Sequence, residues 1–179
     1  MIQKISPIHS SFDFQNASDL KKVDIYFNQL HGWYLDWAKR LNRNDLQEHS
    51  GFAVLYLAMG IFESIGGLFY NNQKSKELFR KGFKLIFESE TKELNIDDSS
   101  IDKLYSQERC GFYHNLSARK GIILMDNIDE RYPFILKGDN WFFNKYRFVD
   151  KIIKRVKELQ VEINKDPELI ASVLKRMNE

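Results

Sequence analysis

The chain has 179 residues, of which 25 are aromatic and 12 are Gly or Pro, and its 27 Lys and Arg residues stand against 25 Asp and Glu residues. This length predicts a single domain over residues 1–179, and the aromatic share of 14% excludes intrinsic disorder. A formal net charge of +2 excludes a protein whose whole surface is held to nucleic acid by charge, so any polynucleotide contact must be local. So few Gly and Pro residues argue against a β-sandwich or barrel and favour long helices.

Cysteine content and the N-terminal residues bear on location and cofactors. Cys110 is the single cysteine, so it cannot form an internal disulfide, and the absence of a C-x-x-C pair gives no zinc motif. The first 15 residues hold no continuous apolar segment typical of a secretory signal. We therefore expect a cytoplasmic protein, and no motif in the sequence predicts a cofactor or a metal site.

The first predicted helix runs from about Ser18 to Arg43 and follows an N-terminal arm of residues 1–17. Its apolar residues are separated alternately by three and four positions, which places them on one stripe of a helix. They are Leu20, Val23, Phe27, Leu30, Tyr34, Trp37 and Leu41.

The second predicted helix, from about Ser50 to Tyr70, is apolar around most of its circumference, which predicts the central element of a bundle. Residues 51–70 are nearly long enough to span a membrane. However, Glu63 lies in the middle and no basic flank sets an orientation. We expect a helix buried in a soluble core or in a dimer, with a transmembrane helix as the alternative and no membrane partner.

Four further helices and a hairpin complete the expected fold. The third helix is predicted from Ser75, as N-cap, to about Glu88, and the fourth from a capping-box-like start at Ser99 and Asp102 to about Arg119. Two β-prone runs, 121–126 and 132–137, predict a two-stranded hairpin.

A fifth helix is expected over about 144–165, and Asp166 before Pro167 predicts a short last helix over 166–179. The predicted fold is therefore mainly all-α, an antiparallel bundle of about five to six helices with a small β-hairpin after the fourth helix.

Charge is separated along the chain although it nearly cancels in total. Residues 88–102 hold six acids and one Lys, whereas residues 145–157 hold six basic residues and one Asp. Two solvated faces would explain this pattern. Alternatively, the fifth helix supplies a local surface that contacts phosphates.

Most reaction classes lack their motifs in this sequence. It has no Gly-rich phosphate loop, no G-x-S-x-G elbow and no His pair at metal spacing. A Ser-His-Asp triad stays possible, because its members meet only in space, but nothing in the sequence points to one. What remains is an Arg-x4-His pair, Arg109 and His114, in the fourth predicted helix. About 0.2 such pairs are expected by chance in this composition, so the context of the pair carries the inference.

The stretch Arg-Cys-Gly-Phe-Tyr-His, late in a predicted helical bundle that also carries Glu63 on an apolar helix, resembles the HEPN superfamily (higher eukaryotes and prokaryotes nucleotide-binding). It is most similar to small bacterial members that carry an Arg-x4-His motif. The resemblance covers about residues 20–163 as an architecture and about six residues as a motif. It implies a ribonuclease, active as a homodimer, in which Arg109 and His114 line a shared cleft.

The pair suits RNA cleavage on chemical grounds as well. His114 is of the right type to take the proton from a 2′-hydroxyl near pH 7, and Arg109 offers donors that match phosphate oxygens. Five positions on a helix turn through about 500°, which leaves the two side chains about 140° apart. They can converge if the helix is loosened around Gly111, or if two protomers contribute one pair each, which is the arrangement that the resemblance implies.

Supporting roles are predicted for Glu63, Tyr113 and Asn115. An acid on an apolar helix needs a cation or a donor, and Arg109 is the natural candidate for Glu63. A structural network that joins the second and fourth helices explains Glu63 equally well. Tyr113 could stack on a base, although an aromatic residue at this place is more often part of the core.

Our leading hypothesis is a metal-independent HEPN-like endoribonuclease of a bacterial defence or toxin-antitoxin system, which binds RNA and has a possible antitoxin or other protein partner. The alternative is a non-catalytic HEPN-like interaction or nucleotide-binding module in which the Arg-His pair is structural. Cys110 favours this alternative, because catalytic members usually carry a polar residue after the Arg. A small-molecule enzyme of another mechanism has no supporting motif.

Overall fold

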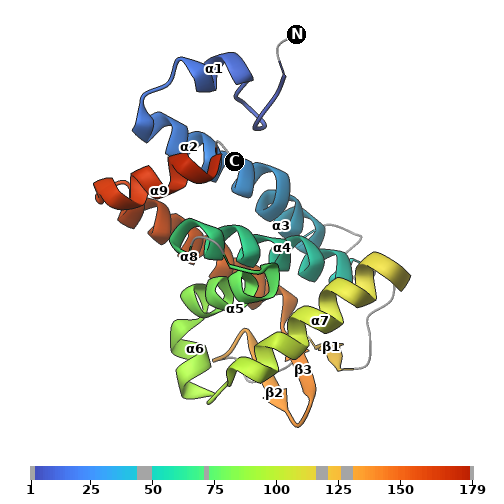
Figure 1. Cartoon of the computed structure of the whole chain (residues 1–179). Coiled ribbons are helices and arrows are strands. Elements are labelled where there is room, and N and C mark those ends of the chain that lie inside the picture. The colour runs from blue at the N-terminus through green and yellow to red at the C-terminus, as the bar shows by residue number, and fades with distance from the viewer. Residues whose placement is uncertain (1–2, 44–49, 71–72, 116–120, 126–130, 178–179) are drawn as a thin grey trace.

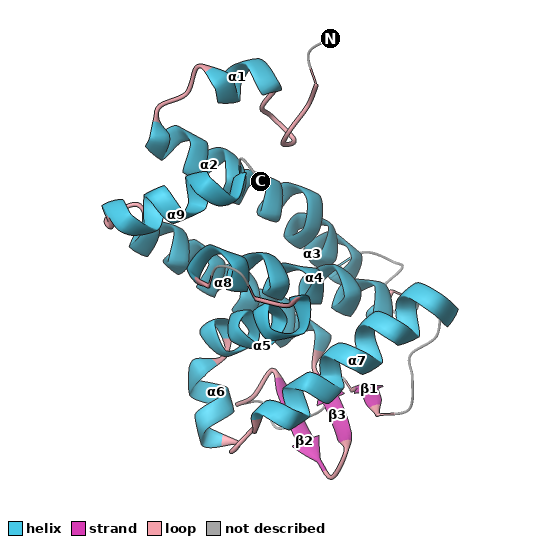
Figure 2. Cartoon of the chain, viewed as in Figure 1, coloured by secondary structure: helices cyan, strands magenta, loops and turns pink. Residues whose placement is uncertain are grey.

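Helices make up most of the protein, and a small three-stranded sheet lies at one end of the bundle (Figures 1 and 2). The computed structural model describes residues 3–43, 50–70, 73–115, 121–125 and 131–177, and within helix α7 (Asp98–Asn115) it describes only the backbone from residue 108 onward. One cluster of buried apolar residues extends from Val23 to Val173 and so draws on nearly every helix. The predicted class, mainly helical with a little β-structure, is confirmed.

The first predicted helix is interrupted in its middle by a π-helical turn. It consists of α2 (Asp19–Leu30), η1 (His31–Leu35) and α3 (Asp36–Arg43). A π-turn adds one residue, so the buried stripe moves on by one position and continues with Leu35 and Ala38, both 0% exposed. The prediction that Tyr34 and Trp37 belong to the stripe was therefore wrong: they are 40% and 52% exposed.

The N-terminal arm packs against this turn. It contains a short helix, α1 (Ser11–Gln15), whose N-cap Ser10 and Asp13 form a capping box. The side chain of Gln29 donates a hydrogen bond to the carbonyl of Ile5. A Cβ at Gly32 would lie only 2.1 Å from Pro7 Cγ, so this glycine allows the arm to approach the turn.

The central pair of helices is α4 (Gly51–Phe69) and α5 (Ser75–Ile86), and both were predicted within one or two residues. They cross at two glycines whose backbones touch. A Cβ at Gly66 would lie 2.0 Å from the carbonyl oxygen of Leu78, and one at Gly82 would lie 1.9 Å from that of Phe62. No larger residue fits at this crossing without moving a helix.

In the described part of the chain, α4 is the one helix that is long and apolar enough to cross a membrane, with a mean hydropathy of 1.8 over its most apolar window. Of that window, 56% is buried inside the protein. It packs against α3, α5, α8 (Lys145–Ile163) and α9 (Pro167–Met177). α4 is therefore packed on several sides by other helices, as expected for the central element of a bundle.

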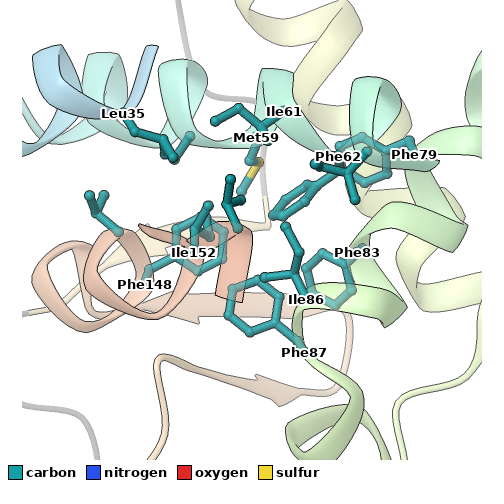
Figure 3. Packing of buried hydrophobic residues seen from close by; sticks show 14 of the residues in the cluster. Leu35, Met59, Ile61, Phe62, Phe79, Phe83, Ile86, Phe87, Phe148 and Ile152 are labelled. Atoms are coloured by element: carbon teal, nitrogen blue, oxygen red, sulfur yellow. The ribbon is translucent and has the colours of Figure 1, made fainter. Parts of the chain in front are cut away.

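Phenyl rings from α4, α5 and α8, together with that of Phe87 just after α5, meet in the core (Figure 3). Phe62 contacts Phe79, Phe83, Phe87 and Phe148, with ring centroids 5.2–6.1 Å apart. All five rings are at most 2% exposed. Edge-to-face contacts of this kind add to the free energy gained by burying the rings.

The third predicted helix ends at Ile86, before the expected Glu88, and a second short helix, α6 (Glu88–Glu93), follows it. The N-cap of α7 is also different from the one predicted. The side chain of Asp97, rather than Ser99, accepts a hydrogen bond from the backbone N–H of Ser100 at 2.8 Å. Acids of the 88–102 run then fix α7 against α5, because Arg80 forms ion pairs with Asp98 at 3.6 Å and Asp102 at 3.3 Å.

The sheet differs from the predicted hairpin. Its strands are β1 (Ile122–Leu124), β2 (Phe134–Lys137) and β3 (Asn140–Phe143), in the order β1-β3-β2. The two predicted runs are both strands, but they pair with β3 and not with each other: β1 is parallel to β3, and β2 is antiparallel to it. The hairpin therefore joins β2 and β3 through Gly138, whose φ of +59° suits glycine.

The last two helices follow the prediction closely. Asn144 caps α8 by accepting from the N–H of Arg147 at 3.1 Å. Asp166 caps α9 by accepting from Glu168 and Leu169. The predicted apolar stripe of α8 is buried and consists of Val149, Ile152, Val156, Leu159 and Ile163.

Candidate functional site

Arg109 and His114 both lie on the continuous α-helix α7. Their side chains, and those of Tyr113 and Asn115, lie outside the described residues. The backbone is regular through Gly111, so the loosened turn that could bring the pair together in one chain does not occur. Helical geometry keeps the two positions about 140° apart.

Glu63 lies on the side of α4 that is not covered by the phenyl rings. It is half-buried, less than expected for an acid on so apolar a helix, and it lines a pocket of about 420 Å³. Its expected partner, Arg109, lies among the side chains that are not described. Another guanidinium, that of Arg176 on α9, lines the same pocket.

This pocket, which we call the tyrosine pocket, is built from six helical segments, one of which, α5, supplies only the ring of Phe79. α4 contributes Tyr56, Gly60 and Glu63, which recur at helical spacing and share one face. The other segments supply further phenol rings and one guanidinium. These residues are Tyr26 of α2, Tyr34 of η1, Tyr105 of α7 and Arg176 of α9.

The π-helical turn explains why a tyrosine of the first long helix reaches the pocket. Because the turn moves the buried stripe to Leu35, the ring of Tyr34 is left on the surface beside α4. Its Cε1 lies 3.9 Å from where a Cβ of Gly60 would be. The missing side chain at Gly60 therefore keeps the space beside this ring open.

Two buried side chains form the inner wall of the tyrosine pocket. Phe79 and Met59 are 2% and 1% exposed. The ring of Phe79 contacts that of Tyr105 at 5.2 Å and, on its other side, that of Phe62 at 5.3 Å. The pocket thus rests directly on the phenyl core.

Tyr26 is held in its neutral form. Burial raises the pKa of Tyr26 to about 12, although the nearby Arg176 guanidinium and a hydrogen bond with Ser64 act in the opposite direction. The side chain of Arg176 lies against Gly67: a Cβ added to Gly67 would be 3.2 Å from Nε of Arg176. One wall of the pocket therefore combines a neutral phenol, a hydroxyl and a guanidinium.

The basic run of α8 is only partly available to a ligand. Lys151 forms an ion pair with Glu90 at 2.8 Å, and Arg155 forms one with Glu162 at 2.7 Å and donates to the carbonyl of Leu85. One basic residue of α8 is thus paired with an acid of α6, and another with an acid of α8 itself. A groove of about 660 Å³ remains, with more basic than acidic side chains: it is lined by Arg131, Arg147, Lys151 and Lys154 beside Glu90 and Asp150.

Among the side chains that the structure describes, no group of three or more His, Cys, Asp and Glu residues lies close enough together to hold a metal ion. The chemistry offered by the tyrosine pocket is that of ring stacking, hydrogen bonding to Glu63 and Ser64, and attraction of an anion to Arg176.

Sequence reasoning found one residue of this pocket, Glu63, from its contrast with an apolar helix. It missed the tyrosines, because they are far apart in the sequence. One signal was present: the spacing of Tyr56, Gly60 and Glu63 marks a polar, partly open face on an otherwise apolar helix.

Comparison of the chain with protein-family models, with curated proteins and with solved structures finds no match.

Proposed function

We propose that the protein is a HEPN-like endoribonuclease whose active form is a homodimer, with Arg109 and His114 of both chains around a shared cleft. The observation that carries the proposal is the place of the pair: Arg109 is four positions after Tyr105, one helical turn beyond the tyrosine pocket. An open pocket of aromatic, acidic and basic side chains therefore adjoins the helix that carries a candidate base and a candidate phosphate-binding group.

In this mechanism His114 takes the proton from a 2′-hydroxyl, which then attacks the neighbouring phosphorus. Arg109 stabilises the charge that grows on the phosphate oxygens. His114 of the other chain can return a proton to the leaving 5′-oxygen. The two Arg-His pairs of the dimer together supply a base, an acid and cations, so the proposed reaction is metal-independent.

A dimer is supported by two features. The regular helix keeps Arg109 and His114 apart in one chain, and Trp33 and Trp37 remain 43% and 52% exposed beside η1 and α3, where a second chain can cover them. We expect a mass in solution of twice the chain mass of 21.3 kDa. A monomer at the concentration where cleavage is seen would contradict the shared cleft.

The proposed setting is the cytoplasm of a bacterium, in a defence or toxin-antitoxin system with an antitoxin or other protein as neutralising partner. It depends on the resemblance of the Arg-x4-His stretch, and the buried central helix α4 is compatible with it.

The test is cleavage of total RNA and transfer RNA in the presence of EDTA. We expect His114→Ala to abolish cleavage and Arg109→Ala to reduce it at least a hundredfold, in the range of a lost acid-base group or charge stabiliser. His9→Ala, in the N-terminal arm, where His9 hydrogen-bonds to Ser6, is the matched control and should cleave normally. An unchanged cleavage pattern in His114→Ala would exclude the catalytic assignment.

The second candidate function is a non-catalytic interaction or nucleotide-binding module. It is favoured by the same regular helix, which separates the pair within one chain, and by the ion pairs that occupy much of α8. A thermal-shift screen with nucleotides and short RNAs separates the two functions. If the protein has no nuclease activity, and either a mononucleotide raises its melting temperature or none of the RNAs does, it is such a module.

A further inference from the structure

We propose that the tyrosine pocket is a base-binding subsite for single-stranded RNA, which holds one base next to the nucleotide cleaved at Arg109 and His114. The proposal deepens the proposed ribonuclease function and depends on it. It assigns the substrate class, an unpaired RNA segment, to a set of residues that the Arg-His pair does not include.

The aromatic content of the pocket favours a planar ligand. Tyr34, Tyr56 and Tyr105 come from three different elements and border one opening, which Gly60 keeps free of a side chain. Stacking on such rings is the usual way in which proteins hold unpaired bases, because every base offers a π-face. A volume of about 420 Å³ is in the range of small-ligand pockets and leaves room for a base with its ribose.

The polar groups match the other parts of a nucleotide. Glu63 can accept hydrogen bonds from amino or imino groups at the edge of a base, and Ser64 can donate or accept. Arg176 is exposed at the rim, where its guanidinium can contact a backbone phosphate. A ring platform, an edge acceptor and a peripheral cation are three kinds of contact with which proteins bind a nucleotide.

The position of the pocket relates it to the cleavage site. Tyr105 and Arg109 are separated by four positions of α7, which is about 6 Å along the helix axis. If the base of one nucleotide contacts Tyr105, the next nucleotide of the strand can therefore reach the helical turn that carries Arg109. The basic groove at α8 lacks this relation, since it is lined by α6, α8 and the segment before β2.

The test measures binding of fluorescein-labelled RNA hexamers of each base by fluorescence anisotropy, with every protein carrying His114→Ala to prevent cleavage. Tyr34→Leu and Arg176→Gln change exposed side chains and should leave the fold intact, which circular dichroism verifies. We expect Tyr34→Leu to weaken binding about five- to a hundredfold, the loss of one stacked base. Arg176→Gln should weaken binding and reduce its salt dependence by about one phosphate contact.

Matched controls lie nearby but outside the tyrosine pocket. Tyr70→Leu changes a 37% exposed tyrosine at the C-cap of α4, and Lys175→Gln changes the exposed neighbour of Arg176. Both should bind within about twofold of the parent protein, because neither contacts the proposed ligand. Equal affinity of Tyr34→Leu, Arg176→Gln and the parent would overturn the subsite, and so would the absence of binding to any hexamer.

A second measurement separates failure of the subsite from failure of the nuclease. With His114 present, Tyr34→Leu should raise KM and alter the preferred base beside the cut more than it lowers kcat. If His114→Ala abolishes cleavage but Tyr34→Leu changes neither affinity nor base preference, the nuclease stands and the subsite fails. If His114→Ala still cleaves while Tyr34→Leu binds RNA weakly, the nuclease assignment fails and the pocket remains an RNA-binding site.

Discussion

Two groups of aromatic residues lie on different sides of α4, and they differ in chemistry and in exposure. On one side Phe62 is enclosed by phenyl rings that are at most 2% exposed. On the other side the aromatic residues are mostly tyrosines, and Tyr34 is 40% exposed. The phenyl core has no polar atoms to satisfy, so its contacts contribute to stability. The tyrosine pocket keeps rings and hydroxyls accessible, which stability alone does not require.

Phe79 joins the two groups, because its ring contacts Phe62 on one side and Tyr105 on the other. Rigid packing of the core therefore fixes the inner wall of the pocket. If this contrast is correct, substitutions in the core should change the free energy of unfolding strongly, whereas substitutions at the rim of the pocket should change ligand binding.

The largest effect is expected for Phe62→Ala. Removing a ring that contacts four others leaves a cavity, and we expect a loss of about 3 to 5 kcal/mol in the free energy of unfolding. Urea unfolding followed by circular dichroism measures it. Phe52→Ala, on the same helix but 37% exposed, is the control and should lose about 1 kcal/mol or less. Similar losses for the two variants would show that the phenyl core is not the main source of stability.

A second prediction compares two glycines of α4. Gly66→Ala places a Cβ 2.0 Å from the carbonyl oxygen of Leu78, so α4 and α5 must separate, at a cost of about 1 to 3 kcal/mol or more. Gly60→Ala meets no atom closer than 3.9 Å and should stabilise the helix by up to about 1 kcal/mol. In thermal unfolding we expect Gly66→Ala to lower the melting temperature and Gly60→Ala to raise it. A change in the same direction for both variants would contradict the close crossing of the helices.

The buried phenol of Tyr26 predicts a dependence of stability on pH. Because its pKa is about 12 in the folded protein and 10.0 ordinarily, the unfolded chain loses the phenol proton first. The free energy of unfolding should therefore be fully retained below about pH 10 and should fall as the pH rises to about 12. Tyr26→Phe removes this contribution, so its denaturation midpoint should fall less steeply over this interval than that of the parent. If the denaturation midpoints of Tyr26→Phe and the parent fall equally with pH, the pKa of Tyr26 is not raised by burial.

The smallest effect on stability is expected at the rim. Tyr34→Leu changes an exposed ring, and we expect the free energy of unfolding to change by no more than about 0.5 kcal/mol. Urea denaturation measures it alongside the RNA binding described above. A loss of about 2 kcal/mol would instead make Tyr34 part of the structural core and would remove the contrast between the two groups.

The elements that the sequence predicted well are those with local signals. The buried stripe of α8 and the cap at Asp166 follow from spacing and from residue type, which act within one or two turns. The π-helical turn could not be predicted in this way, because a stripe through Tyr34 and Trp37 keeps the usual spacing of three and four, whereas the true stripe steps five positions from Leu30 to Leu35.

The pairing of strands that are distant in the sequence was the other feature that could not be predicted. Two β-prone runs separated by a polar segment favour a hairpin, yet both pair with β3, whose four residues, Asn140–Phe143, are too short for a pattern of their own. In the candidate site Glu63 could be predicted from its apolar neighbours. The tyrosines around it come from separate helices, and only the tertiary fold brings them together.

Contacts between early and late helices of the chain also bear on how fast the protein folds. Asp24 of α2 accepts a hydrogen bond from Gln160 of α8, 136 positions later, and Leu68 of α4 accepts one from Ser172 of α9, 104 positions later. A helical bundle closed by such distant contacts has a higher contact order than an up-and-down bundle of neighbouring helices. We therefore expect slower folding than for a local bundle of this size, with the docking of α9 against α2 and α4 as a late step.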